Sequence, residues 1–347
     1  MIATMNDTRI SLLNQWLASL PTALALNARE MVPASSDASF RRYFRLPAGK
    51  ATAIVMDAPP PHEDCRPFVD VDARLAAVGL NVPHILASDL EHGFRLLSDL
   101  GPTTYYDRIV QGIDDTTLQR LYRDALASLV TLQQANHQGL AVYDAVRLKS
   151  ELGLFSEWFA RVHCQAPLDA AATGALDKVF DLLVAHNALA PRVLVHRDFH
   201  SPNLMVCGQP EHGPNPGVID FQDALSGPIT YDLASLVMDA RTTWEEPQQL
   251  DWAIRYWEGA RSAGLPVDSD FANFHRDYEW MGLQRNLRIL GVFARLNHRD
   301  GKSAYLAHMP RVIGYVRQVA GRYSAFRPLL RVMDQLEKIQ RGVGYTF

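Results

Sequence analysis

The chain has 347 residues, of which 48% are hydrophobic and 21% are charged, and its formal net charge is −4 at pH 7. This composition is typical of a folded protein with a sizeable core and excludes a disordered or fibrous chain. Because the charge is slightly negative and no run of like charges occurs, we expect neither a nucleic-acid partner nor binding to an anionic membrane.

The first elements already argue against export. Apolar residues between positions 12 and 20 recur at helical spacing, which predicts an amphipathic helix and not a secretion signal. No continuous apolar run reaches the roughly 18 residues of a membrane span. The three cysteines are isolated and form no C-x-x-C pair, so we expect no disulfide framework and no zinc site. We therefore expect a cytoplasmic protein.

Residues 31–57 combine short alternating segments with turn residues. They predict three antiparallel strands, at 31–35, 40–46 and 51–57. A helix over 65–80 and two more strands, at 81–88 and 93–99, should follow. The pattern changes to long helical periods after Gly101-Pro102, apart from residues 192–221, where short apolar strands flank a polar loop. The fold class is therefore α+β, with a small antiparallel sheet followed by a larger, mainly helical part.

That polar loop carries the strongest chemical signal. It reads His196-Arg197-Asp198-Phe199-His200-Ser201-Pro202-Asn203, and Asp220 follows in Val-Ile-Asp-Phe. Phosphoryl transfer needs a carboxylate to orient the attacking hydroxyl and oxygen ligands for magnesium, and the H-R-D-x-x-x-x-N spacing with a downstream I-D-F supplies both. The structural alternative is a surface turn and a strand-terminal carboxylate.

The segments VLVHRDFHSPNLMV and GVIDFQDALSGPITYDLASLV resemble those of the aminoglycoside phosphotransferase family, which includes choline kinase-like enzymes. The resemblance implies a bilobal fold like that of protein kinases and the use of ATP and Mg2+. By it, Asp198 is the catalytic base, Asn203 and Asp220 hold magnesium, and His196 and Asp232 support the loop structurally. It also implies a nucleotide-binding lobe over 1–100 and a lobe over 101–347 that holds the catalytic loop and the acceptor site.

Several further segments, among them SSDASFRRYFR, VMDAPPPHEDCRPFV and MGLQRNLRILGVFARLNHRDGK, resemble one branch of this family. That branch phosphorylates the anomeric hydroxyl of N-acetylmuramate and N-acetylglucosamine to the α-1-phosphate during peptidoglycan recycling. The resemblance therefore implies a small-molecule amino-sugar substrate, and we expect a monomer. Two alternatives stay open: a kinase for another acceptor, such as an aminoglycoside or choline, and a nucleotide-binding regulator without catalysis. A protein kinase is disfavoured because no A-P-E segment follows Asp220.

The nucleotide side departs from the kinase pattern. The third strand of such a fold normally carries a phosphate-binding lysine, but Lys50 is the only lysine before Lys149 and lies in a turn. Backbone amides and hydroxyls of the preceding loop can offer hydrogen bonds to phosphates instead, and Arg41 or Arg42 can supply the charge. Solvent-exposed strand arginines are the alternative. The expected nucleotide-binding residues are Ser35, Ser36, Ser39, Arg41, Arg42, Ser98, Asp99 and Leu100.

The acceptor side rests on two helical faces. Glu151, Phe155 and Trp158 follow helical spacing, and such a face can line a sugar pocket, although it can equally be an ordinary packing face. Arg288 lies on a second helix with further arginines, and a guanidinium can bind the lactyl carboxylate of N-acetylmuramate, although a solvated arginine face is the alternative. The expected substrate-binding residues are Asp198, Glu151, Trp158 and Arg288.

Overall fold

The computed structural model describes residues 2–34, 41–60, 62–209 and 212–343. The chain forms two compact units. The first comprises Met1–Leu121 and Pro202–Asp223, and the second comprises Tyr122–Ser201 and Ala224–Phe347. The expected division into lobes at residue 100 stays a prediction, because compact units and functional lobes need not share boundaries.

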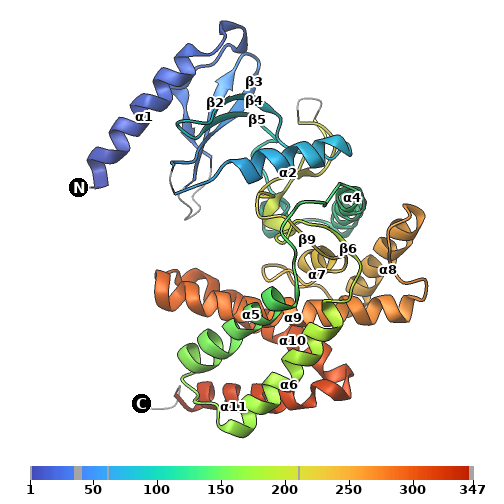
Figure 1. The fold of residues 1–347 in the computed structure, drawn as a ribbon. Helices are drawn as coiled ribbons and strands as arrows, with labels where there is room; N and C mark the ends of the chain where they lie inside the picture. The colour runs from blue at the N-terminus through green and yellow to red at the C-terminus, as the bar shows by residue number, and fades with distance from the viewer. Residues whose placement is uncertain (1, 35–40, 61, 210–211, 344–347) are drawn as a thin grey trace. The chain divides into compact units, whose positions relative to one another are not determined.

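A five-stranded antiparallel sheet dominates the first unit (Figure 1). Its order is β1-β2-β3-β5-β4, and the strands are β1 (Val32–Pro33), β2 (Arg42–Ala48), β3 (Ala51–Asp57), β4 (Ile85–Asp89) and β5 (Phe94–Ser98). All five strands predicted from the alternating segments are present. Each pairs with its neighbour in the sheet through an antiparallel register.

The two faces of this sheet have different neighbours. Helix α1 (Ile2–Ser19) covers one face, where Leu13 and Leu17 pack with Val55, Phe94 and Leu96 (Figure 1). Successive side chains along a strand alternate between the two faces of the sheet, so the residues that precede and follow Val55, Phe94 and Leu96 in their strands point to the opposite face. The sheet therefore has one face closed by a helix and a second face available to other parts of the unit.

The rest of the first unit adds short elements. Helix α2 (Arg66–Ala77), predicted from sequence, buries Phe68, whose ring stacks on Phe221 with centroids 5.0 Å apart. Helix α3 (Tyr105–Val110) begins with a capping box between Thr104 and Asp107. The strands β7 (Leu204–Met205) and β8 (Gly217–Val218) pair with each other and hold the segment between them. Asn203 and Asp220 thus flank a small antiparallel pair.

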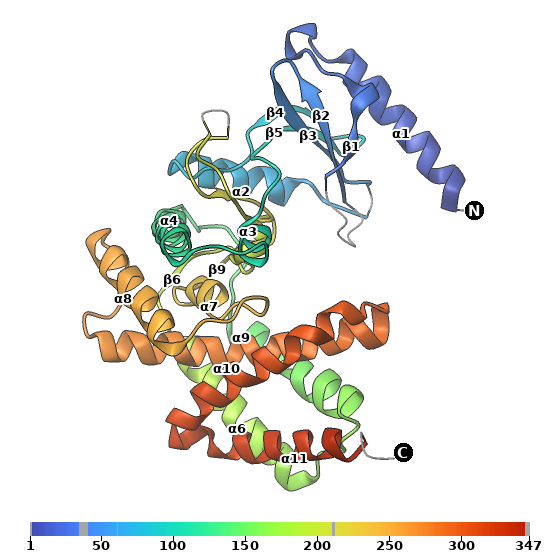
Figure 2. The ribbon, with the colours of Figure 1, turned by 180° about the vertical axis from the view of Figure 1, so that it is seen from behind.

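The second unit is mainly helical, as predicted. Its helices include most of α4 (Asp115–Gln133), then α5 (Ala145–Leu154), α6 (Ala170–Asn187), α7 (Tyr231–Val237), α8 (Glu246–Ser262), α9 (Phe271–Asp300), α10 (Met309–Arg322) and α11 (Arg327–Val343). Helix α10 packs on α9, and α6 and α11 lie side by side (Figure 2). Strands β6 (Arg192–Val195) and β9 (Leu225–Pro228) pair antiparallel within this unit. Over the described part of the chain, no helix combines the length and the apolar character needed to cross a bilayer.

One predicted helix differs from expectation. The segment from Lys149 onward is α-helical only to Leu154, and Phe155–His163 continues as a π-helix. Helix α9 presses on this junction, because a Cβ added to Gly291 would lie 2.4 Å from the backbone carbonyl of Leu154. The tight crossing requires glycine at that position. Since a π-helix has more residues per turn, Glu151 and Trp158 do not keep the regular α-helical spacing assumed from sequence.

Candidate active site

The loop that carries Asp198, residues 196–203, follows strand β6, and Asp232 holds its first residues by hydrogen bonds. This carboxylate lies in the first turn of α7, is fully buried, and accepts hydrogen bonds from the backbone amides of His196 (2.6 Å) and Arg197 (2.9 Å). Arg197 has a φ of 79°, a left-handed conformation that is unfavourable for a side chain of its size. The two bonds to Asp232 compensate for this strain and fix the start of the loop.

A second carboxylate fixes the other end of the loop. The amide of Ser201 donates to Asp239 over 3.2 Å and its hydroxyl donates over 2.5 Å. Between these anchors the amide of His200 donates to the carbonyl of Asp198 over 3.0 Å. The loop that carries Asp198 is therefore hydrogen-bonded along its length within the second unit.

Positive charges surround Asp198. Burial alone would raise the pKa of its carboxyl, but His200, Arg288, Arg285 and Arg197 lower it, in that order, to about 2. Burial also lowers the pKa of His200 to about 4, so this imidazole is neutral at pH 7 and the three arginines supply the charge there. Asp198 is thus ionised at neutral pH and is a weak base.

Glu151 links two of these arginines. Its carboxylate pairs with Arg197 and Arg288, each at 3.2 Å, and accepts a short hydrogen bond from the hydroxyl of Tyr143. The structure therefore brings together Glu151 and Arg288, which were predicted separately. Trp158 lies in the π-helix and is partly exposed. Arg285 on α9 is buried, and its Nε and Nη1 have no partner among the residues described.

In the first unit, Asn203 and Asp220 also lie together. Asn203 Nδ2 donates to one oxygen of Asp220 over 3.2 Å, and Gln222 Nε2 donates to the other over 2.8 Å. Asp220 has a φ of 67°, which turns its side chain out of the strand direction. The buried Oε1 of Gln222 has no hydrogen-bond partner in the part of the chain that the structure describes.

These side chains suit magnesium. Mg2+ prefers oxygen ligands, takes one or two carboxylates, and keeps several waters. Asp220 supplies a carboxylate, and Asn203 and Gln222 supply amide oxygens when their terminal groups turn over. Within the described ranges, no cluster of three or more histidine, cysteine or acidic side chains offers an alternative metal site. The donor set therefore fits a magnesium ion that is also coordinated by phosphates.

The two arginine candidates separate onto opposite faces of the sheet. Arg42 pairs with Asp57, which also binds Arg9 of α1, so Arg42 lies on the face that α1 covers. Arg41 pairs with Glu63 at 2.9 Å and hydrogen-bonds to Tyr43. Of the two, Arg41 is the better placed toward the uncovered face. The candidates Ser35, Ser36 and Ser39 lie outside the described residues.

The remaining nucleotide candidates, Ser98, Asp99 and Leu100, make local contacts. Asp99 binds Arg45 (2.5 Å) and Thr52 (2.6 Å), and it accepts the amide of Gly101 (2.9 Å). Ser98 accepts the amide of His84, and the carbonyl of Leu100 accepts the thiol of Cys207 over 3.2 Å. These contacts hold the segment in place. Its side chains are engaged locally, so any contact with adenine would come from its backbone groups.

Neither Gln222 nor Arg285 is among the candidate residues predicted from the sequence. Gln222 lies two residues after Asp220, but a lone amide has no periodic signal. Arg285 precedes Arg288 by one helical turn, and this spacing could have singled it out as part of the same cluster.

Residues 30–272 match the phosphotransferase enzyme family. The chain belongs to this family. The N-acetylmuramate/N-acetylglucosamine kinase of Pseudomonas aeruginosa is 44% identical to it over 339 residues, covering 95% of this chain and 96% of the relative. A kinase of the same name from Neisseria meningitidis is 42% identical and covers 90% of this chain and 93% of the relative.

Solved structures show the same fold. The ADP-bound aminoglycoside phosphotransferase APH(2'')-Ib has a TM-score of 0.59 at 13% identity, covering 90% of this chain and 98% of that one. Choline kinase LicA from Streptococcus pneumoniae has a TM-score of 0.57 at 15% identity, covering 83% and 94%. At these identities the likeness shows the fold alone. It confirms the predicted protein-kinase-like α+β fold of this phosphotransferase.

Proposed function

We propose that this phosphotransferase uses ATP and Mg2+ to phosphorylate the anomeric hydroxyl of N-acetylmuramate and N-acetylglucosamine. The observation that carries the proposal is the 44% identity, over nearly the full length of both chains, to a kinase named for these two sugars. The loop with Asp198, fixed by Asp232, supports the transfer chemistry.

In the proposed reaction the anomeric oxygen attacks the γ-phosphorus of ATP. The bond from that phosphorus to the β–γ bridging oxygen breaks, ADP leaves, and the hydroxyl proton passes to Asp198 and then to solvent. Because the pKa of Asp198 is about 2, this carboxylate orients the hydroxyl and accepts its proton only late, as the bond to phosphorus forms. An anomeric hydroxyl, which is more acidic than an ordinary alcohol, suits so weak a base.

Magnesium, when bound, neutralises the charge that develops on the phosphates. We assign Asn203 and Asp220 to hold it, and Gln222 adds an amide oxygen beside them. We retain Arg41 among the nucleotide-binding residues, with the backbone of Ser98–Leu100 as the adenine contact.

Glu151, Trp158 and Arg288 remain our candidates for the acceptor site. Glu151 and Arg288 form an ion pair, and the charge of Arg288 acts on Asp198, so both lie close to the base. If Arg288 binds the lactyl carboxylate, Arg288→Gln lowers kcat/KM for N-acetylmuramate more than for N-acetylglucosamine. An equal loss for both sugars would refute that role.

The product, a sugar α-1-phosphate, would feed nucleotide-sugar synthesis during peptidoglycan recycling, which requires a cytoplasmic enzyme with access to ATP. We expect a monomer, and light scattering coupled to size exclusion measures the mass directly.

The deciding experiment incubates the protein with ATP, magnesium and a panel of acceptors that includes both amino sugars, kanamycin and choline. We expect phosphorus NMR to show an α-1-phosphate of the amino sugars, and Asp198→Asn to reduce turnover about 1,000-fold. A 6-phosphate, or transfer only to kanamycin or choline, would contradict the proposal. ATP binding without any transfer would identify a nucleotide-binding regulator.

A further inference from the structure

Arg95 is a buried cation that forms no ion pair with any residue the structure describes. It lies in β5, and its side chain is 0% exposed. Its Nη1 donates to the carbonyl of Phe94 over 3.0 Å, whereas Nε and Nη2 have no partner among the described residues. A buried charge left unpaired costs several kcal/mol. The free protein therefore holds a guanidinium that needs an anion from elsewhere.

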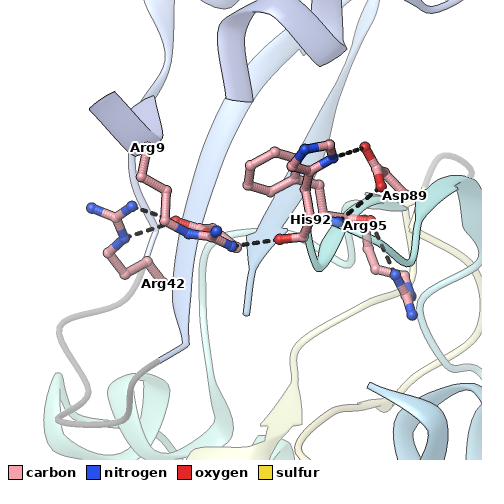
Figure 3. Close-up of polar contacts among 7 residues, drawn as sticks. Arg9, Arg42, Asp89, His92 and Arg95 are labelled. Carbon is pink, nitrogen blue, oxygen red and sulfur yellow. Dashed lines mark hydrogen bonds and ion pairs between the residues drawn. The ribbon is translucent and has the colours of Figure 1, made fainter. Parts of the chain in front are cut away.

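The register places this guanidinium on the face of the sheet that α1 does not cover, where Arg95 and Met56 are both 0% exposed. Arg95 lies opposite Met56 of β3, and Met56 lies opposite Tyr43 of β2, so the three side chains share one face. Phe94 and Leu96, the neighbours of Arg95 in β5, point to the α1 face instead. Figure 3 shows the same division, with Arg9 and Arg42 meeting on one side and Arg95 directed away from them.

The uncovered face looks toward the candidate magnesium residues. Tyr43 is buried there, and burial raises the pKa of its phenol to about 12, with the charge of Asp220 adding to the shift. The charges of Arg95 and Arg41 both act on the thiol of Cys65, at the start of α2. Arg95 thus belongs to the same neighbourhood of the first unit as Arg41, Tyr43 and Asp220.

No acidic side chain of this neighbourhood answers the charge of Arg95. Glu63 pairs with Arg41. Asp72 of α2 is buried with an unpartnered Oδ1, and none of the ion pairs between described residues joins it to Arg95. Among the residues that the structure describes, the guanidinium of Arg95 is therefore left available to an anionic ligand.

We propose that Arg95 binds the α- and β-phosphates of the nucleotide, from β5, in place of the strand lysine that this chain lacks. The inference rests on the proposed function in so far as ATP is the phosphoryl donor. Met56 stands directly across from Arg95, so a guanidinium on β5 serves the face that a cationic side chain of β3 would serve. The planar fork of arginine also binds two phosphate oxygens at once.

The test compares Arg95→Met and Arg95→Lys with Arg9→Met as a matched control. Arg9 is an arginine of the same unit that pairs with Asp57 on the opposite face and binds the carbonyl of His92. Calorimetry gives the dissociation constants of Mg–ADP and adenosine, and thermal unfolding gives the stability of each free protein. We expect Arg95→Met to weaken Mg–ADP at least tenfold, with adenosine changed less than twofold and no fall in the unfolding midpoint. Arg95→Lys should retain part of the ADP affinity.

Arg9→Met should show the opposite pattern, with a lower midpoint and an unchanged ratio of ADP to adenosine affinity. The inference is wrong if Arg95→Met binds Mg–ADP within twofold of the wild type, or if it loses stability as Arg9→Met does. If the wild type binds ADP but phosphorylates neither sugar, the proposed function is refuted. The dissociation constants of the Arg95 variants for Mg–ADP would still decide whether Arg95 binds the phosphates.

Discussion

Arg288 is largely buried and Arg95 is fully buried, and the surroundings of the two arginines differ. Arg288 pairs with Glu151, which also binds Arg197 and Tyr143, so both arginines face an opposite charge, although Nε of Arg197 has no hydrogen-bond partner among the described residues. Arg95 has only the carbonyl of its neighbour Phe94. This ion-paired network holds the loop that carries Asp198 in place before any ligand binds. A buried cation without a partner favours the binding of an anionic ligand, because the ligand supplies the missing negative charge.

Of the substitutions that test this comparison, Arg288→Met should have the largest effect on stability. The substitution leaves Glu151 buried beside Arg197 with one partner removed, so we expect a loss of about 3 kcal/mol of stability, measured by urea unfolding. The control is Arg255→Met, which removes an exposed ion pair with Asp251 and should cost less than about 0.5 kcal/mol. Equal losses for the two variants would mean that the network around Arg288 stabilises the protein no more than an exposed ion pair does.

A smaller effect concerns the carboxylate that the arginines surround. Folding lowers the pKa of Asp198 from 3.8 to about 2, so its charge contributes about 2 kcal/mol of stability above pH 4. That contribution declines as the pH falls from 4 toward 2, where the folded carboxyl also takes up a proton. Asp198→Asn should therefore destabilise the protein by about 2 kcal/mol at pH 7 and by less at pH 3, measured by urea unfolding at both values. A loss that does not depend on pH would mean that the arginines do not act on this charge.

The smallest effect is expected from Arg42→Met. Arg42 shares Asp57 with Arg9, so the carboxylate keeps one partner after the substitution. We expect a loss of about 1 kcal/mol in thermal or urea unfolding. Calorimetry on the same variant tests the role in nucleotide binding that was predicted from the sequence. A tenfold weaker Mg–ADP complex would show that Arg42 contributes to phosphate binding.

Much of the fold followed from periodicity. The strands at β1 to β5 and the helices around α9 could be predicted because alternating and helical patterns reflect burial directly. The π-helix at Phe155–His163 could not, since it begins beside a close contact between Leu154 and Gly291, which lie far apart in the sequence.

The candidate site divides in the same way. Asp198, Asn203 and Asp220 could be named because their chemistry demands fixed spacing within one short segment. The faces of Arg41 and Arg42 became distinguishable only with the register of β2 and β3. Arg95 had no sequence signal at all, because what distinguishes it is the absence of a partner, and partners are set by tertiary contacts.

The low pKa of Asp198 has a consequence for the cell. A catalytic base that titrates near pH 7 makes its enzyme sensitive to the acidity of its surroundings. Here the carboxylate is charged and the adjacent His200 is neutral at every pH between about 5 and 8. Neither group changes its charge over that pH range, so we expect the activity that we propose to depend little on these two groups when the pH becomes mildly acidic.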